Sequence, residues 1–212
     1  MALKLYARPG WGSAIVEYQF AFYGLAYQRI EVEDLFQSEK GRETVRPLNP
    51  LAQIPTLLMD DDTVLTESAA ITLWLADRTG SDALVPAAGS PERADFLRWL
   101  IFLVANIYPC FTFADDPARF VEPEAARKLF RAAVDAHEQR LWQHVEVASG
   151  EPWFLGGRLS AIDAYLAVMT RWRPGIGWFQ AHAPRLWAAG ERFAALPGVD
   201  RAAAANQDPL LD

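Results

Sequence analysis

The sequence is poor in the residues that build disulfide and metal sites. Its 212 residues include one cysteine, Cys110, and three scattered histidines. A lone cysteine forms no intrachain disulfide, and these residues have none of the spacings typical of zinc ligands. We therefore expect neither a disulfide scaffold nor a metal centre.

Positive charge and long apolar stretches are also scarce. The 20 Lys and Arg residues are outnumbered by 27 Asp and Glu residues, for a net charge of −7, whereas a nucleic-acid partner selects clustered basic residues. The apolar run Leu100–Ala105 is six residues long, far below the ~20 residues that span a bilayer. The first residues have no signal-peptide pattern. These absences predict a cytoplasmic protein that binds neither nucleic acid nor membrane.

Hydrophobic residues are plentiful, and the tryptophans are unevenly placed. The chain is 51% hydrophobic and 22% charged, which is typical of a globular protein. Six of its eight tryptophans follow residue 90. This imbalance indicates two halves that are built differently.

The N-terminal part alternates between strand and helix patterns. Residues 3–6 have the period of a strand, which ends at the turn Pro9-Gly10. A helix is predicted from Ser13, as its N-cap, to the C-terminal glycine Gly24, and residues 26–32 form a second strand. A strand–helix–strand unit of this length closes by default as a parallel pair.

The next segment predicts a hairpin followed by a helix. Residues 33–48 are weakly patterned and contain at most one short helix. Residues 54–59 and 63–65 read as two strands joined by an acidic turn. Thr66 then caps a helix that ends at Gly80.

The C-terminal half predicts only helices. Residues 80–90 have the composition of a linker, and Pro91 is expected to begin a helix that Pro109 kinks or ends. Further helices are expected over residues 123–147, after the capping signal at 160–163, and over 185–196. We therefore expect a domain at 1–79, a linker at 80–90 and an all-helical domain at 91–212.

Two short motifs suggest a function only when they are joined. The Ile54-Pro55 pair alone reads as an edge strand, and Glu67-Ser68 alone reads as an ordinary helix start. Together, the run from 49 to 57 and the run from 67 to 71 resemble the glutathione-binding half of the cytosolic glutathione transferases. The helix after Ser160 resembles the capping-box helix of the same superfamily, so the resemblance covers nearly the whole chain. It implies an α/β thioredoxin-like N-terminal domain and an all-α C-terminal bundle.

The resemblance also implies how glutathione binds. Pro55 would follow a cis peptide bond, and Ile54 would pair its main chain with the cysteinyl unit by strand addition. Glu67 would bind the γ-glutamyl ammonium group, and Ser68, at a helix N-terminus, would bind the carboxylate. Gln53 is a weaker candidate for further backbone contacts.

The residue that activates the thiol has two candidates. The segment 4–13 resembles the opening of bacterial beta-class members, with Gly12 in place of their cysteine and Ser13 retained. Without that cysteine a mixed disulfide with glutathione is disfavoured. The Ser13 hydroxyl is then the expected thiolate stabiliser, although Ser13 also reads as a simple N-cap, and Tyr6 is its rival.

The second substrate is expected between the two domains. Trp11, Tyr108 and Phe111 are the candidate residues of its hydrophobic wall. Asn106 is a candidate to reach the glutathione of a neighbouring subunit. Cys110 is expected to be a buried packing residue.

The resemblance implies a homodimeric enzyme of detoxification. Its expected reaction joins the thiolate of glutathione, as co-substrate, to a small hydrophobic electrophile, without a metal. Peroxide reduction, isomerisation or dehalogenation on the same site, and a non-catalytic binding module, are the alternatives, because a fold does not decide its chemistry.

Overall fold

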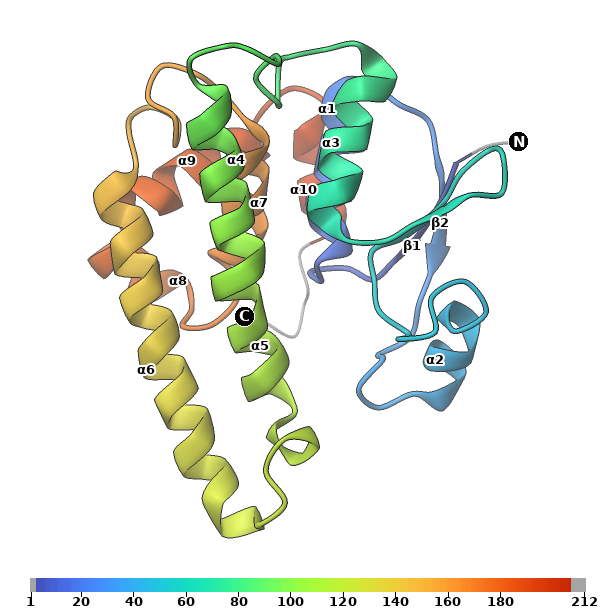
Figure 1. The fold of residues 1–212 in the computed structure, drawn as a ribbon, viewed down its shortest axis with the longest axis vertical. Coiled ribbons are helices and arrows are strands. Elements are labelled where there is room, and N and C mark those ends of the chain that lie inside the picture. Colours follow the sequence, from blue (N-terminus) through green and yellow to red (C-terminus); the bar gives the residue numbers. More distant parts are fainter. Residues whose placement is uncertain (1–2, 207–212) are drawn as a thin grey trace. The chain divides into compact units, whose positions relative to one another are not determined.

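The computed structural model describes residues 3–206, which divide into two compact units (Figure 1). The first consists of Met1–Val85 together with the segment from Glu191 onward, and the second of Pro86–Gly190. The division after Val85 lies within the predicted linker. The C-terminal segment differs from the prediction, because it groups with the first unit and not with the helices that precede it.

A mixed four-stranded sheet forms the centre of the first unit. Its strand order is β2-β1-β3-β4, with β1 and β2 parallel and the other pairs antiparallel. The sequence patterns predicted the parallel pair and the β3–β4 hairpin, but not the pairing of β1 with β3. The strands are β1 (Lys4–Ala7), β2 (Gln28–Glu31), β3 (Thr56–Leu58) and β4 (Val64–Leu65). This is the mixed sheet of a thioredoxin-like domain.

The side chains on the two faces of β1 pack in two different hydrophobic clusters. Leu5 and Ala7 point into a core that also holds residues of α1 (Ser13–Tyr23) and α3 (Ser68–Thr79). Each fully buried Leu, Ile or Phe of such a core contributes ~1.5–3 kcal/mol. Tyr6, between them on the strand, packs instead against a smaller cluster beside α2 (Glu39–Val45). The alternation of the strand thus separates a structural face from a second face that carries Tyr6.

The helix ends were predicted better than the helix starts. Gly24 and Gly80 terminate α1 and α3 in the left-handed conformation, at φ +64° and +61°, as expected of C-terminal glycines. The N-cap of α1 is Gly12, not Ser13, and the N-cap of α3 is Glu67, not Thr66. Both predictions were wrong by one residue, and the Ser13 hydroxyl bonds to the Arg8 backbone instead of to a helix N–H.

A short terminal helix explains why the C-terminal segment joins the first unit. Helix α10 (Val199–Ala205) packs against α1, and a Cβ at Gly198 would lie 3.5 Å from the carbonyl oxygen of Ala21. The rings of Phe22 and Phe193 stack nearby, with centroids 6.1 Å apart. Helix α10 was not predicted, since its alanine-rich stretch has no apolar period.

The second unit is a helical bundle. Its helices are α4 (Arg93–Phe102), the π-helical turn η1 (Leu103–Ile107), α5 (Tyr108–Asp115), the 3₁₀ turn η2 (Pro117–Arg119), α6 (Glu124–Ala148), α7 (Ala161–Met169), α8 (Ile176–His182) and most of α9 (Pro184–Ala194). Pro91 lies before the first helix rather than in it. Pro109 lies in the first turn of α5 and does not stop the chain from continuing as helix, because that turn needs no donor from it.

Helix α7 is the centre of the bundle. All nine of its residues are buried, and the predicted capping box of Ser160 and Asp163 is present. Gly190 allows α9 to approach closely, since a Cβ there would lie 2.9 Å from the backbone nitrogen of Ala167. The capping signal in the sequence therefore marked the most deeply packed helix of this unit.

One described helical stretch meets the length and composition expected of a membrane span. It covers Arg93–Asp115, 23 residues, and its 18-residue apolar window has a mean hydropathy of 1.5, with 39% of that window buried within the protein. The sequence analysis did not predict this stretch, because it considered only uninterrupted apolar runs, and Arg98 and Asn106 interrupt the apolar residues here. Part of the apolar surface of this stretch, including the side chain of Ile101, is exposed.

Candidate functional site

Asn49 shapes the loop that leads into β3. Its amide nitrogen donates to the Gln53 carbonyl at 3.0 Å, and its side-chain oxygen accepts from the Leu51 N–H at 3.1 Å. The Thr56 hydroxyl donates to the same Gln53 carbonyl at 2.8 Å. The loop is thereby held as it enters Ile54, and the Ile54–Pro55 peptide bond is cis, as the resemblance implied.

Strand register brings the two glutathione-binding motifs together. Leu57 of β3 pairs with Leu65 of β4 in an antiparallel ladder. Pro55 directly precedes β3, and Glu67 follows β4 by two residues. Because the two strands are antiparallel, both motifs leave the hairpin at the same end of the sheet.

The chain turns sharply at Glu67. This residue has φ +64° and ψ +109°, a backbone conformation that costs of order 1–3 kcal/mol in a non-glycine residue and is concentrated at functional sites. The Glu67 side chain is exposed, whereas Ser68, the first residue of α3, is 8% exposed. The turn thus presents a free carboxylate next to the positive end of a helix.

Ser13 closes the turn between β1 and α1. Its side chain is fully buried, its Oγ accepts the Arg8 N–H at 3.0 Å, and it donates its own proton to the Arg8 carbonyl at 3.1 Å. The hydroxyl therefore bonds to the residue that follows β1, and it accepts no hydrogen bond from the first N–H groups of α1. Its role at the sulfur stays a prediction.

Tyr6, the rival activator, lies on the neighbouring part of β1. It is opposite Thr56 of β3 and is half-buried. With Ile54 it packs against the cluster of Val32, Leu35 and Val45. The strand pairing thus places Tyr6 one strand away from the predicted glutathione backbone site.

Trp11 packs within the α/β unit. Its ring lies 5.1 Å from that of Phe36, between centroids, and the Arg8 guanidinium carbon is 5.6 Å from its centroid. Arg8 also pairs with Asp34 at 3.8 Å. These contacts hold the indole beside the same cluster that supports Ile54 and Tyr6.

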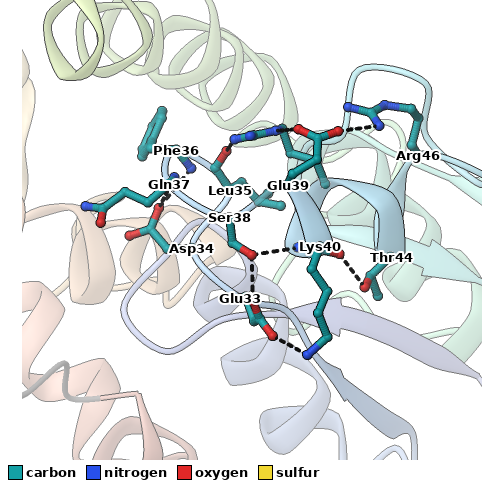
Figure 2. A network of polar contacts seen from close by, with 12 residues as sticks. Glu33, Asp34, Leu35, Phe36, Gln37, Ser38, Glu39, Lys40, Thr44 and Arg46 are labelled. Carbon is teal, nitrogen blue, oxygen red and sulfur yellow. Dashed lines mark hydrogen bonds and ion pairs between the residues drawn. The ribbon is translucent and has the colours of Figure 1, made fainter.

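A polar network orders the segment between β2 and α2 (Figure 2). Glu33 accepts from the Ser38 hydroxyl and from the Lys40 ammonium group, both at 2.6 Å, and Glu39 accepts from Arg42 at 2.6 Å. These donors hold the pKa of both glutamates below its usual range, Lys40 foremost for Glu33 and Arg42 foremost for Glu39. Each pair is exposed and contributes little by itself. Their combined effect is to order a segment whose sequence pattern was weak.

In the helical unit, two predicted wall residues form an aromatic cluster with a third. The Tyr108 and Phe111 rings meet edge to face at 6.4 Å, and Trp172 contacts them at 5.4 and 4.9 Å, between centroids. Trp172 was missed, although its position just after the capping-box helix was a usable signal. Cys110 is buried beside this cluster, and burial raises the pKa of its thiol to about 11, which fits a packing role.

The guanidinium group of Arg173 packs against the aromatic cluster. The Arg173 guanidinium carbon lies 5.3 Å from the Phe111 centroid, and the same guanidinium bonds to Asp115 at 2.7 Å and to Asp135. Glu138, 1% exposed, lies 3.8 Å from it. Burial raises the pKa of Glu138 to about 7, with the nearby Arg173 charge opposing that shift. Arg173 thus contacts both the acidic side chains and the ring of Phe111.

Over residues 3–206 no group of three His, Cys, Asp or Glu side chains is arranged to hold a metal ion.

Sequence and structural similarities identify the family. A sequence model described as "Glutathione S-transferase, N-terminal domain" matches residues 16–78. The uncharacterized GST-like protein YncG of Escherichia coli K12 is 36% identical over 206 residues, which cover 97% of this chain and 98% of that protein. This chain belongs to the glutathione transferase family.

Two further comparisons relate this transferase to bacterial glutathione transferases. Glutathione S-transferase GstA of Escherichia coli O157:H7 is 28% identical over 96% of this chain and 98% of its own. A glutathione transferase homologue from Sulfitobacter, solved with bound glutathione, has a TM-score of 0.85 at 25% identity, over 94% of this chain and 96% of that one. The predicted membership and fold are confirmed, and the chain is a glutathione transferase related to bacterial enzymes.

The transferase also has site residues that the sequence patterns did not reveal. Asn49 and Thr56 anchor the loop before Ile54 through buried hydrogen bonds. Both residues lie in the motif of residues 49–57, but the sequence analysis gave their side chains no individual role. Their side-chain roles depend on where the folded loop places the Gln53 carbonyl.

Proposed function

We propose that this transferase binds glutathione along Ile54, Glu67 and Ser68 and joins its thiolate to a hydrophobic electrophile. The observation that carries the proposal is the antiparallel β3–β4 hairpin, from which the segments of Pro55 and Glu67 leave at the same end of the sheet. An extended main chain for strand addition then lies beside an exposed carboxylate and a helix N-terminus. Those three features match the cysteinyl amide, the ammonium group and the carboxylate of glutathione. Gln53, exposed on the same loop, is proposed for a further contact.

The Ser13 hydroxyl is proposed to stabilise the thiolate after a rotation. In the described structure its proton goes to the Arg8 carbonyl, which also accepts the Trp11 N–H at 3.2 Å. That carbonyl therefore stays hydrogen-bonded when the hydroxyl turns to sulfur, and the Arg8 N–H still holds the oxygen. Lowering a thiol pKa of ~8.5 by ~2 units needs about 2.7 kcal/mol, and one hydrogen bond to a charged group contributes about 1.5–3 kcal/mol.

The electrophile is proposed to bind against the aromatic cluster of Tyr108, Phe111 and Trp172. Edge-to-face packing leaves such rings rigid, which favours a flat apolar ligand. Trp11 remains a proposed wall residue, contributed by the α/β unit. The thiol proton passes to solvent, and the thiolate sulfur forms a bond to an electrophilic carbon. The electron pair of the bond broken at that carbon goes to a halide that leaves, to the oxygen of an opened epoxide or to the conjugated oxygen of an enone, and that oxygen then takes up a proton.

The transferase is proposed to act as a cytoplasmic homodimer in detoxification. Ile101 is 51% exposed in the apolar stretch Arg93–Asp115, with the exposed Ala105 one turn further on. A second copy would cover this surface. Light scattering should give a mass of about twice 23.7 kDa, and a monomeric mass at micromolar concentration would refute the dimer.

Binding and turnover test the proposed reaction together. Saturating glutathione should raise the melting temperature by several degrees, because a ligand that binds only the native state stabilises it. Conjugation should then be measured with aryl halides, epoxides and enones, and peroxide reduction with an organic hydroperoxide. The absence of a thermal shift would refute glutathione binding. A shift with hydroperoxide turnover alone, or with no turnover, would refute conjugation.

A further inference from the structure

A buried hydrogen-bond chain joins the two helices that begin at the proposed glutathione site. The Gln19 amide nitrogen in α1 donates to the Thr72 hydroxyl in α3 at 2.9 Å and to the Ile15 carbonyl at 3.1 Å. The Thr72 hydroxyl in turn donates to the Ser68 carbonyl at 2.9 Å. Gln19 and Thr72 are both fully buried. One continuous polar chain therefore crosses an otherwise apolar helix interface.

Both ends of this chain lie near helix N-termini. Ile15 is in the first turn of α1, two residues after Ser13. Ser68 is the first residue of α3 and follows the strained Glu67. The chain thus links the start of one helix to the start of the other, with two side chains between them.

Directional bonds control spacing in a way that the surrounding core does not. Val16, Phe20, Ile71 and Leu75 pack in the same core, and such contacts have no preferred direction. A buried hydrogen bond weakens steeply with misalignment, and a buried polar group without a partner costs about 1–3 kcal/mol. The Gln19–Thr72 contact therefore favours one relative position of α1 and α3.

We propose that Gln19 and Thr72 are positioning residues that set the distance between the sulfur site at Ser13 and the γ-glutamyl site at Ser68. The inference rests on the proposed function, since it concerns the two ends of one bound glutathione. Glutathione must engage both ends at once, so a small shift between the helices weakens its binding and misplaces its sulfur. Neither residue needs to touch the ligand.

Thr72→Val tests this role while keeping the shape of the side chain. The matched control is Thr79→Val on the same helix, where the hydroxyl donates to the Leu75 carbonyl at 2.8 Å and the Ala76 carbonyl at 3.2 Å. The control loses a similar bond within α3 but leaves the Gln19–Thr72 contact intact. Thr72→Ser retains the hydroxyl, and Gln19→Met removes the donor from the other side with a side chain of similar length.

The inference predicts a change specific to glutathione. Thr72→Val and Gln19→Met should raise the KM for glutathione about three- to tenfold and leave the KM for the electrophile unchanged, as expected for loss of one buried hydrogen bond. Thr79→Val should match the wild type, and Thr72→Ser should restore the KM to within about twofold. Urea unfolding of each variant separates these effects from lost stability.

Two outcomes distinguish the failure of this inference from that of the proposed function. If the wild-type protein binds glutathione and Thr72→Val has the same KM for glutathione as Thr79→Val, the positioning role is refuted and the proposed function stands. If the wild-type protein does not bind glutathione in a calorimetric titration, both are refuted. Should Thr72→Val fail to fold, the same comparison is made with Gln19→Met.

Discussion

Ser13→Ala should lower kcat/KM for conjugation by about ten- to a hundredfold. The expected size is that of one hydrogen bond to a charged group, about 1.5–3 kcal/mol, because each 1.4 kcal/mol is a factor of ten. The thiol of bound glutathione should at the same time become less acidic by roughly one to two pKa units. Glutathione affinity should change little, since the proposed binding contacts are made by Ile54, Glu67 and Ser68.

The pH dependence of kcat/KM measures both effects with a chromogenic electrophile. Tyr6→Phe is the matched control, because it removes the hydroxyl of the rival activator from β1. A loss of rate in Tyr6→Phe but not in Ser13→Ala would transfer the role to Tyr6. An unchanged rate in both would leave thiol activation to the main chain at the start of α1.

Stability must be measured alongside this experiment. The Ser13 hydroxyl also makes two hydrogen bonds to the Arg8 backbone, at 3.0 and 3.1 Å, within a buried turn. Ser13→Ala is therefore expected to lower the free energy of unfolding by about 1–2 kcal/mol. Ser13→Thr keeps a hydroxyl and should retain most of the activity if the turn accepts the extra methyl group.

Asp163→Ala should lower the free energy of unfolding by about 3–5 kcal/mol. The fully buried Asp163 carboxyl accepts the Phe154 N–H at 2.8 Å, the Ser160 N–H at 2.9 Å and the Ser160 hydroxyl at 3.3 Å. Alanine leaves those donors without their acceptor, and each orphaned buried group costs about 1–3 kcal/mol. The loss is a large part of a typical total stability of about 5–15 kcal/mol.

Urea unfolding at pH 8 checks this prediction. Burial raises the pKa of Asp163 to about 7 against the hydrogen bonds that lower it, so the stability of the wild-type protein falls as the pH rises through this range, and each variant is compared with it at one fixed pH. Asp200→Ala is the control, since the exposed Asp200 also accepts two backbone N–H groups, from Gly198 at 3.1 Å and Arg201 at 2.9 Å. The control should lose less than about 1 kcal/mol. Equal losses of unfolding free energy in the two variants would contradict a special role for the buried capping box of Ser160 and Asp163.

Local patterns in the sequence predicted the local structure well. Gly24 and Gly80 end their helices because a left-handed residue without a Cβ is a property of a single position. The capping box of Ser160 and Asp163 involves residues three apart, so its signal also lies in one short segment. The β3–β4 hairpin was visible for the same reason, since its two strands are separated only by an acidic turn.

Predictions that depended on distant partners were less successful. Ser13 carried the composition of an N-cap, yet its hydroxyl bonds to Arg8, the residue that follows the preceding strand. Trp172 joins Tyr108 and Phe111 only because the bundle brings the turn after α7 against α5. The grouping of the C-terminal segment with the first unit depends in the same way on the packing of α10 against α1.

The sequence by itself determined the family, the parallel β1–β2 unit and the β3–β4 hairpin, because each is specified by residue types at short, fixed spacings. Only the tertiary structure decided the hydrogen-bond partners of Ser13, the link from Gln19 to Thr72 and the aromatic cluster at Trp172. Gln19 and Thr72 are 53 residues apart, and no local pattern relates them. A hydrogen bond requires its two atoms to meet within about 3 Å, and for such a pair only the folded chain brings them that close.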